Sequence, residues 1–312
     1  MNIKKTEVNF IKIIKFEDES YPKKLRNIDN PPKQLYVLGD EKILENKGIA
    51  IVGSRNCTEY GRKYGEFFSS KLTNYGMQII SGLATGIDTC AHIGCLKEGG
   101  KTIAVLGSGF NYIFPEENIS LANEIIEKGG AVISEYSPET KKKSDYFRNR
   151  NRIVSGLSEG VLVVEAKNRS GTSITAKFAK EQEKEIFCIP VGLDNKCGLG
   201  TNKLIQGGAK LVIHPYEIIT NTKIKNTKNQ IIEKEICEYK KRFEELEKKE
   251  NINIKEEYRI VYEILGKNPI NINEICKRTN KEISEVSFIL TMLELDGYVE
   301  ELYGKEFKKI IF

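Results

Sequence analysis

Residues 48–54 read Gly-Ile-Ala-Ile-Val-Gly-Ser, and residues 77–82 read Met-Gln-Ile-Ile-Ser-Gly. In both stretches a short apolar run ends in a turn of small residues, which is typical of a buried strand that leads into a helix. The pattern recurs as far as Ile213 and predicts strands at residues 49–52, 77–80, 101–106, 131–133, 161–164, 186–189 and 211–213. Amphipathic segments between them, such as 64–75, 87–97 and 120–128, predict helices. This alternation indicates an α/β fold with a doubly wound, mostly parallel sheet.

The turns that are rich in Gly and Ser follow the predicted strands, at the sheet edge where such folds bind ligands. Small residues let backbone N–H groups approach a phosphate, and a helix N-terminus adds a favourable dipole. One such turn is ordinary in an α/β fold, but four exceed what one nucleotide requires. We therefore expect a chain of phosphates to cross this edge.

A run of arginines precedes the strand expected at 161–164. Residues 147–152 read Phe-Arg-Asn-Arg-Asn-Arg. Guanidinium groups beside an aromatic ring suit phosphates and bases that are presented together. The run therefore predicts a single-stranded nucleic acid held at the edge of the sheet.

Composition limits the other classes of function. The net charge of +5 over 312 residues is only mildly basic, so a nucleic-acid surface must be local. Seven cysteines without a Cys-x-x-Cys pair, and only two histidines, argue against a disulfide framework or a structural zinc site. We expect reduced thiols and a cytoplasmic location, and we find neither a leader pattern nor an apolar run that would span a bilayer.

No cofactor or catalytic group is expected either. The stretch that starts at Gly107 lacks the third glycine of a dinucleotide fingerprint, and no turn has the spacing of a P-loop. Asp88 is expected to cap a helix, and His92 to be a packed histidine. Glu165 has no partner for acid–base chemistry and is read as a structural carboxylate.

Several motifs together resemble the DNA-processing protein A (DprA, also Smf) family. They span roughly residues 20–217 and include Ile-Val-Gly-Ser-Arg at 51–55, Ser-Gly-Leu-Ala-Thr-Gly-Ile-Asp at 81–88, Arg-Asn-Arg-Ile-Val-Ser-Gly-Leu-Ser at 150–158, Val-Val-Glu-Ala at 163–166 and Gly-Thr-Asn-Lys-Leu-Ile at 200–205. The resemblance implies an extended Rossmann fold, a homodimer, binding of single-stranded DNA and loading of RecA recombinase during natural transformation. It implies no catalytic residue, no metal and no cofactor.

The resemblance also implies which residues contact DNA. Arg150 and Arg152 would supply charge to the phosphate backbone, Asn151 a hydrogen bond, and Phe147 a stacking surface. Arg148 stands where the family usually has proline, so the local backbone is expected to differ. The full set implied is Gly53, Ser54, Arg55, Ser81, Gly82, Gly86, Gly107, Ser108, Gly109, Lys143, Phe147, Arg150, Asn151, Arg152, Ser170, Gly171 and Thr172.

The chain is expected to divide into four parts: a short N-terminal extension (1–47), the sheet domain (48–220), a charged linker with a helix (221–257) and a C-terminal module (258–312). In the module, helices are expected at 258–266, 273–279 and 282–296, followed by a hairpin. This pattern resembles the winged-helix domain of many DprA proteins. Its third helix is acidic, which favours a protein contact over duplex DNA, with weak DNA contact by Lys305, Lys308 and Lys309 left open.

Two alternatives remain. The first is a nucleotide-processing enzyme of the related phosphoribohydrolase-like fold, although the glutamate expected after Thr175 is absent. The second is a duplex DNA regulator that works through the winged helix.

Overall fold

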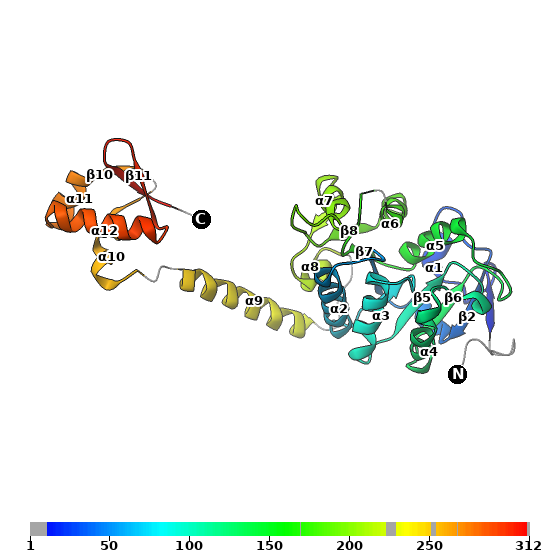
Figure 1. The fold of residues 1–312 in the computed structure, drawn as a ribbon. Coiled ribbons are helices and arrows are strands. Elements are labelled where there is room, and N and C mark those ends of the chain that lie inside the picture. The colour runs from blue at the N-terminus through cyan, green and yellow to red at the C-terminus, as the bar shows by residue number, and fades with distance from the viewer. Residues whose placement is uncertain (1–10, 169, 223–228, 251–253, 267, 311–312) are drawn as a thin grey trace. The chain divides into compact units, whose positions relative to one another are not determined.

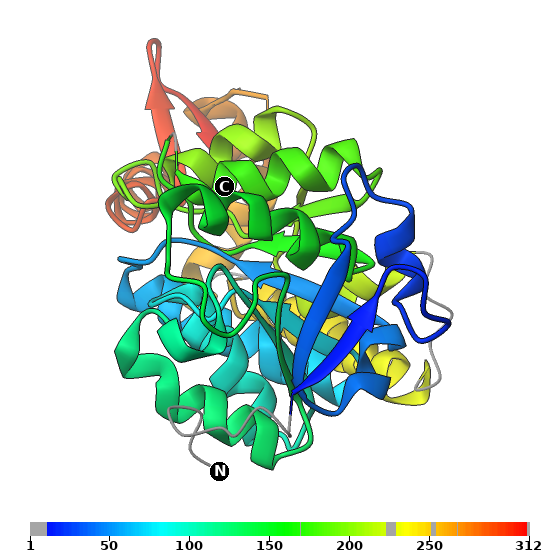
Figure 2. The same cartoon turned by 90° about the vertical axis from the view of Figure 1, so that its right-hand side faces the viewer.

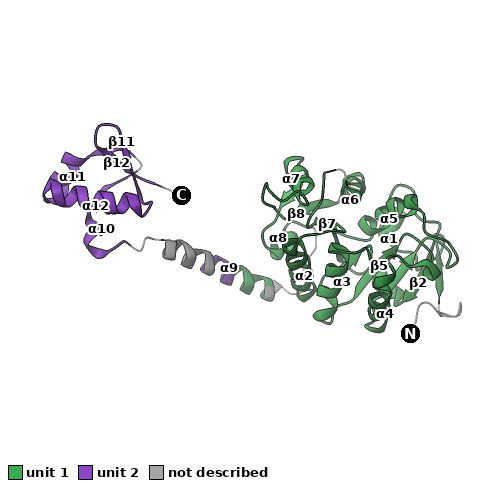
Figure 3. Ribbon diagram, in the orientation of Figure 1, with its two compact units in different colours: residues 1–236 green, residues 237–312 purple. Residues whose placement is uncertain are grey.

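The computed structural model describes residues 11–168, 170–222, 229–250, 254–266 and 268–310 (Figure 1). The chain forms two compact units, residues 1–236 and 237–312 (Figure 3). Each unit is described by itself.

The first unit is built on a nine-stranded sheet with the order β1-β2-β6-β5-β4-β3-β7-β8-β9. Strands β3 to β9 are parallel, whereas β2 is antiparallel to both β1 and β6. The order reverses between β3 and β7, which are neighbours in the sheet but far apart in sequence. The doubly wound, mostly parallel sheet predicted from the sequence is confirmed. The parallel strands are β3 (Gly48–Val52), β4 (Gln78–Ser81), β5 (Thr102–Leu106), β6 (Ala131–Ser134), β7 (Gly160–Val163), β8 (Glu185–Cys188) and β9 (Lys210–Leu211).

Alternate residues of each central strand face opposite layers of helices, as the period of a strand requires. Ala50 and Val52 pack in one core with α1 (Lys23–Arg26), α5 (Ser144–Gly156), α6 (Gly171–Glu181) and α7 (Leu199–Gln206). Ile49 and Ile51 pack in the other, with α2 (Glu59–Asn74), α3 (Ile87–Lys97) and α8 (Pro215–Thr220), and α4 (Ile119–Glu127) extends that layer. Figure 2 shows the bright green helices α5 and α6 on one side of the sheet and the blue to blue-green helices α2, α3 and α4 on the other.

Both edges of the sheet differ from the sequence expectation. Strands β1 (Lys12–Lys15) and β2 (Gln34–Gly39) come from the segment expected to be an N-terminal extension, and they continue the sheet through β6. At the other edge, β9 was expected to be buried, but Leu211 is 50% exposed. Tertiary pairing therefore draws residues before position 48 into the sheet.

The first turns of α9 (Asn229–Glu250) belong to the first unit. Ile232 is buried in the core that includes α2, and the Glu235 carboxylate accepts hydrogen bonds from Lys71 (2.6 Å) and from the Tyr75 hydroxyl. Part of the segment expected to be a charged linker is thus fixed to the sheet unit.

The second unit contains the rest of α9 from Cys237 on, and its described residues after position 253 form three further helices and a small sheet. They are α10 (Glu256–Ile264), α11 (Ile272–Thr279) and α12 (Ile283–Leu295), with strands β10 (Ile270–Asn271), β11 (Val299–Leu302) and β12 (Glu306–Lys309). The strand order is β10-β12-β11, and the hairpin of β11 and β12 follows α12 as the wing of a winged helix. Val261, Leu290 and Phe307 lie in its core.

Candidate nucleic-acid interface

A pocket of about 890 Å³ lies at the carboxyl ends of the strands, where the strand order reverses between β3 and β7. This is the position at which open α/β sheets bind ligands. Its walls are the end of β3 with the loop that follows it (residues 52–56), the loop after β4, the start of α6 with the loop before it, and one face of α5. Of the predicted residues, the pocket is lined by Gly53, Ser54, Arg55, Gly82, Phe147, Arg150, Asn151, Ser170, Gly171 and Thr172.

Backbone contacts join the loops at the floor of this pocket. The Ser54 amide donates to the carbonyl of Glu165 (2.7 Å), and the Ile87 amide donates to the carbonyl of Ser54 (3.2 Å). Gly86 has a φ of +78°, and a Cβ there would lie 2.3 Å from the Ser54 carbonyl oxygen. A larger residue at Gly86 would therefore separate two loops that shape the pocket.

Glu165 is a structural residue. Its side chain is fully buried and accepts hydrogen bonds from the Thr58 amide (2.9 Å), the Thr58 hydroxyl (2.5 Å) and the Asn195 amide group (2.9 Å). A Cβ on Gly61 would lie 2.4 Å from its Oε2, so this glycine makes room for the carboxylate. Glu165 thereby ties the end of β7 to the start of α2.

The arginine run lies on helix α5, which explains which of its residues reach the pocket. Phe147, Arg150, Asn151 and Val154 all line it, and the spacing i, i+3, i+4, i+7 places them on one face of a helix. The helix is continuous through Arg148, so arginine in place of proline is accommodated in regular backbone.

Arg150 forms the base of the pocket and is 4% exposed. Its Nη1 donates to the carbonyl of Gly82 (2.5 Å) and to that of Val105. Burial lowers its pKa to about 10 although nearby Asp88 raises it, so the group stays charged at neutral pH. Asp88 Oδ2 accepts from the amide of Gly82 (3.1 Å), and burial raises the pKa of this carboxyl. The loop after β4 therefore fixes the position of the charged Arg150 guanidinium, through the hydrogen bond to the Gly82 carbonyl.

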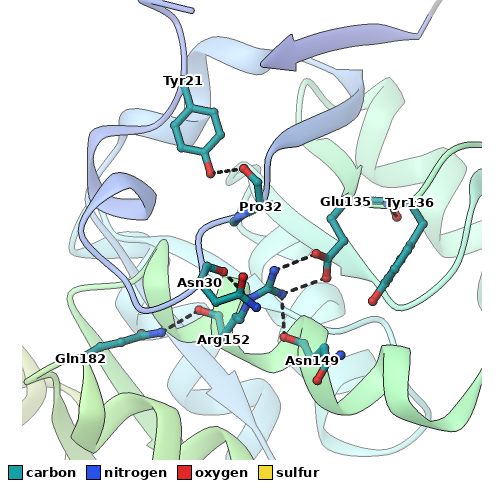
Figure 4. Close-up of polar contacts among 9 residues, drawn as sticks. Tyr21, Asn30, Pro32, Glu135, Tyr136, Asn149, Arg152 and Gln182 are labelled. Atoms are coloured by element: carbon teal, nitrogen blue, oxygen red, sulfur yellow. Dashed lines mark hydrogen bonds and ion pairs between the residues drawn. The ribbon is translucent and has the colours of Figure 1, made fainter. Parts of the chain in front are cut away.

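Arg152 does not line the pocket, because two residues further along a helix the side chain points to nearly the opposite side. Its guanidinium makes two hydrogen bonds to Glu135, at 2.8 and 2.7 Å (Figure 4). It also donates to the carbonyls of Asn30 (2.8 Å) and Asn149 (2.9 Å). In the structure Arg152 joins α5 to the segment after β6 and to the loop before β2, whereas the sequence predicts it beside the DNA.

Six further predicted residues lie outside the pocket lining: Ser81, Gly86, Gly107, Ser108, Gly109 and Lys143. Ser81 and Gly107 support residues or strands next to the pocket without lining it. The Ser81 hydroxyl donates to the carbonyl of Ile51 (2.6 Å), and Gly107 leaves room for Phe147, whose Cδ1 would lie 2.7 Å from a Cβ there. Others serve neighbouring loops, since the Ser108 hydroxyl donates to the carbonyl of Tyr112 (2.8 Å). Lys143 is the N-cap residue of α5 and is exposed.

Sequence reasoning missed two cations of the pocket, Arg148 and Lys167. Both are exposed, as is Arg55. With Arg150 they make four cationic residues against one acid, Asp88, in the lining. The N-terminus of α6 adds positive potential to the same wall, because the dipole of a helix is positive at that end. The site is therefore suited to several anionic groups at once.

The second unit offers a different surface. Between residues 254 and 310 there are eleven acidic and nine basic residues. Lys305 Nζ lies 3.0 Å from Glu301 Oε1, Lys308 Nζ lies 3.1 Å from Glu300 Oε2, and Lys309 Nζ lies 4.2 Å from the centre of the Tyr262 ring. The exposed side of α12 carries Phe288 (58% exposed) and Leu295 (76% exposed), two turns apart. This surface is apolar and acidic, not basic.

Within the described residues, no group of three or more His, Cys, Asp or Glu side chains is placed to hold a metal ion. All seven cysteines are free thiols. Among the helices in the described ranges, none has both the length and the apolar character that crossing a bilayer needs.

Comparison with known proteins agrees with this architecture. The family model described as DNA recombination-mediator protein A matches residues 12–223, and the DprA winged helix domain matches residues 252–305. Protein Smf of Escherichia coli K12 is 43% identical over 209 residues, which are 67% of this chain and 56% of that protein. DNA processing protein DprA of Bacillus subtilis 168 is 42% identical over 203 residues, 65% of this chain and 68% of that one. The chain thus matches little more than half the length of the E. coli protein.

Two solved structures share the fold. The X-ray structure of DNA processing protein A from Streptococcus pneumoniae has a TM-score of 0.65 at 38% identity, over 69% of this chain and 75% of that chain. DNA processing protein A from Helicobacter pylori, solved for its single-stranded DNA binding mode, has a TM-score of 0.60 at 30% identity, over 67% and 94%. Since the first family model alone covers more than half of the sequence, this chain belongs to the DNA recombination-mediator protein A (DprA/Smf) family.

Proposed function

We propose that this protein binds single-stranded DNA without sequence specificity in the pocket at the β3–β7 reversal. The observation that carries the proposal is the lining of that pocket: three exposed cations, a helix N-terminus and the half-buried ring of Phe147 around a volume of about 890 Å³. Phosphates fit the cations and the backbone amides, and an unstacked base fits the ring. The solved structure of the H. pylori relative, which is described in terms of its single-stranded DNA binding mode, supports this assignment.

Sequence tolerance follows from the chemistry of the lining. Guanidinium and ammonium groups bind phosphates, which are the same in every nucleotide, and an aromatic face stacks on any base. In a duplex the bases are already paired and stacked, so Phe147 gains nothing from them. Fluorescence anisotropy with oligothymidylate, a mixed-sequence strand and the matching duplex tests this. We expect similar affinity for the two single strands and weaker binding of the duplex; a preference for the duplex would overturn the proposal.

For the whole protein we propose the role of a recombination mediator that loads RecA recombinase onto the bound strand, in natural transformation or a related recombination process in the cytoplasm. The family match and the DprA names of its relatives support this role. The test is RecA filament assembly on a strand coated with single-strand-binding protein. This protein should speed the assembly, and a variant that no longer binds DNA should not.

We also propose a homodimer that forms through the β9 edge of the sheet. Leu211 in β9 is 50% exposed, and Leu193, in the loop before α7, is 85% exposed. A groove of about 410 Å³ is lined by Leu193, Leu199 and Ile205. An open sheet edge with exposed leucines favours association with a second copy. Light scattering should give twice the chain mass for the natural protein and a single chain mass for Leu193→Asp/Leu211→Asp; a monomer in both cases would contradict the dimer.

The protein is proposed to act without catalysis, and the nucleotide-processing alternative is less well supported. Both Glu165 oxygens already accept hydrogen bonds within the fold, so this carboxylate is not available as a base. Release of free base from nucleoside monophosphates by the purified protein would revive the enzymatic alternative.

For the winged-helix unit we propose a contact with another protein. Phosphates would be repelled by α12 and its acidic surroundings, and each wing lysine already has a partner within the unit. We therefore expect the β11–β12 wing to contribute little to the affinity of the protein for DNA. A charge-removing variant, Lys305→Ala/Lys308→Ala, should leave duplex affinity unchanged, and a clear loss would instead support the duplex regulator.

A further inference from the structure

Beside the pocket lies a second surface that carries exposed aromatic rings and lysines. It is formed by the loop after β5 and by the loop between β6 and α5, at the same edge of the sheet. We call Tyr112, Phe114 and Lys142 the outer platform. Tyr112 is 36% exposed and Phe114 is 40% exposed, and residues 141–143, all lysines, are exposed.

The outer platform is a fixed surface, because the two loops that carry it are bonded to each other. The Gly109 amide donates to the carbonyl of Thr140 (2.9 Å), and the Asn111 amide donates to that of Pro138 (3.1 Å). The Asn111 side chain also donates to Glu139 Oε1 (2.6 Å). A Cβ on Gly109 would lie 2.1 Å from the Ser137 carbonyl oxygen, so glycine is needed where the loops cross.

The outer platform continues directly from the pocket. The Phe114 ring meets the Phe147 ring edge to face, with centroids 6.0 Å apart, and Arg55 lies 6.0 Å from the same Phe147 ring on the pocket side. Beyond Phe114, Lys142 Nζ lies 3.8 Å from the ring centre. A cation, a ring, a second ring and a second cation therefore follow one another outward from the pocket.

Exposed rings interleaved with cations are the usual means by which proteins hold single strands, the rings stacking on bases and the cations binding the backbone. We propose that the outer platform is a second base-binding subsite: the strand leaves the pocket over Phe147, and a following base stacks on Phe114 or Tyr112 while Lys142 binds its phosphate. A small hollow of about 120 Å³ next to this surface is lined by Tyr112, Lys142 and the acid Glu116. The proposal rests on the proposed function, since it extends the same strand by at least one nucleotide.

The test compares oligothymidylates of increasing length, bound to the full chain and to Phe114→Ala/Lys142→Ala. We expect the variant to lose affinity for long oligonucleotides by roughly tenfold or more, the scale of one stacked base, and to keep the natural affinity for the shortest oligonucleotide that fills the pocket. Phe67→Ala is the matched control, because Phe67 is 36% exposed on α2 and lies outside the pocket lining. The single variant Phe114→Tyr, which keeps an aromatic ring and retains Lys142, should bind long oligonucleotides as tightly as the natural protein does.

The outcomes separate the two proposals. Equal affinity of the variant and the natural protein at every length would overturn the outer platform and leave the pocket assignment intact. Failure of the natural protein to bind any oligothymidylate would overturn the proposed function itself. A photo-crosslink from 5-iododeoxyuridine at successive positions of the strand adds direct evidence: we expect one position to label Phe147 and a different one to label Phe114 or Tyr112. Labelling of Phe147 alone would contradict the subsite.

Discussion

Three arginines of one short run have three different surroundings. Arg148 is exposed at the pocket, Arg150 is buried at its base, and Arg152 is buried on another side of the helix against Glu135. A guanidinium that already makes two hydrogen bonds to a carboxylate and two to backbone carbonyls has little left to offer a phosphate. The residue type alone therefore does not tell binding arginines from structural ones.

This difference predicts opposite phenotypes for two variants. Arg152→Ala leaves the Glu135 carboxylate without its partner and should cost about 3 kcal/mol of unfolding free energy, which lowers Tm by roughly 5–10 °C. Arg148→Ala should leave Tm nearly unchanged and weaken binding of single strands. Thermal unfolding and anisotropy on the same preparations check both. Unchanged Tm in Arg152→Ala, together with a loss of DNA binding, would return Arg152 to the interface.

His92 makes stability depend on pH. It is fully buried with Nδ1 2.8 Å from the Thr102 hydroxyl oxygen, and burial, helped by Arg150, lowers its pKa to about 3. Below its ordinary pKa of about 6.5 the unfolded chain takes up a proton that the folded chain does not. The contribution of neutral His92 is therefore complete above pH 6.5 and is lost progressively as the pH falls towards 3.

His92→Asn should make this dependence shallower. Between pH 6.5 and 4.5 the unfolding free energy of the natural protein should fall as the pH falls, and His92 should contribute up to about 1.4 kcal/mol per pH unit to that slope. The variant should lack this contribution. His214 is present in both proteins and cancels from the difference. Denaturant unfolding at several pH values measures it; identical slopes in the two proteins would mean that His92 is protonated in the folded state.

At the scale of elements, helix α5 shows what the sequence predicts and what it leaves open. The composition of residues 147–152 predicts an anion-binding segment, but it does not distinguish the faces of the helix. The signal that separates its faces is the helical spacing of Phe147, Arg150, Asn151 and Val154, which share one face of α5. Lys167 carries no comparable signal, because its place in the pocket depends on the reversal of strand order.

The junction of β7 and α2 gives a prediction at the same scale. Glu165→Gln puts an amide where the Thr58 amide and hydroxyl both need an acceptor, and should cost about 1–3 kcal/mol of stability. Asn195→Ala, which removes one of the three donors, is the milder companion. Chemical denaturation checks the order of the two effects. If the Glu165→Gln protein were as stable as the natural protein, the structural role of this carboxylate would be contradicted, and a role in a reaction would be favoured.

At the scale of the whole molecule, the strand pattern of residues 48–213 was sufficient to predict the parallel sheet, because buried parallel strands are short apolar runs. Two features escaped it. Strand β2 pairs antiparallel with β6, a strand far along the chain, and brings β1 into the sheet with it, and the first turns of α9 pack on α2. Both depend on contacts between distant segments, which local periodicity does not encode.

The charge pattern of the whole molecule also follows from this assembly. The net charge is only +5, yet the sheet brings Arg55, Arg148 and Lys167 from three separate loops and helices to one pocket. Three other lysines lie at the opposite edge of the sheet, where the parallel strands begin: Lys97 ends α3, Lys101 precedes β5, and Lys128 follows α4. Binding should therefore depend on where a charge lies and not on the total.

The salt dependence of oligothymidylate binding tests this claim most directly. For single strands each phosphate contact adds about 0.7 to the slope of log K against log salt concentration. Arg55→Ala/Arg148→Ala/Lys167→Ala should make that slope shallower by about 2, whereas Lys97→Ala/Lys101→Ala/Lys128→Ala, with the same change in net charge, should leave it unchanged. Equal slopes for the two triple variants would contradict the assignment of the pocket as the DNA site.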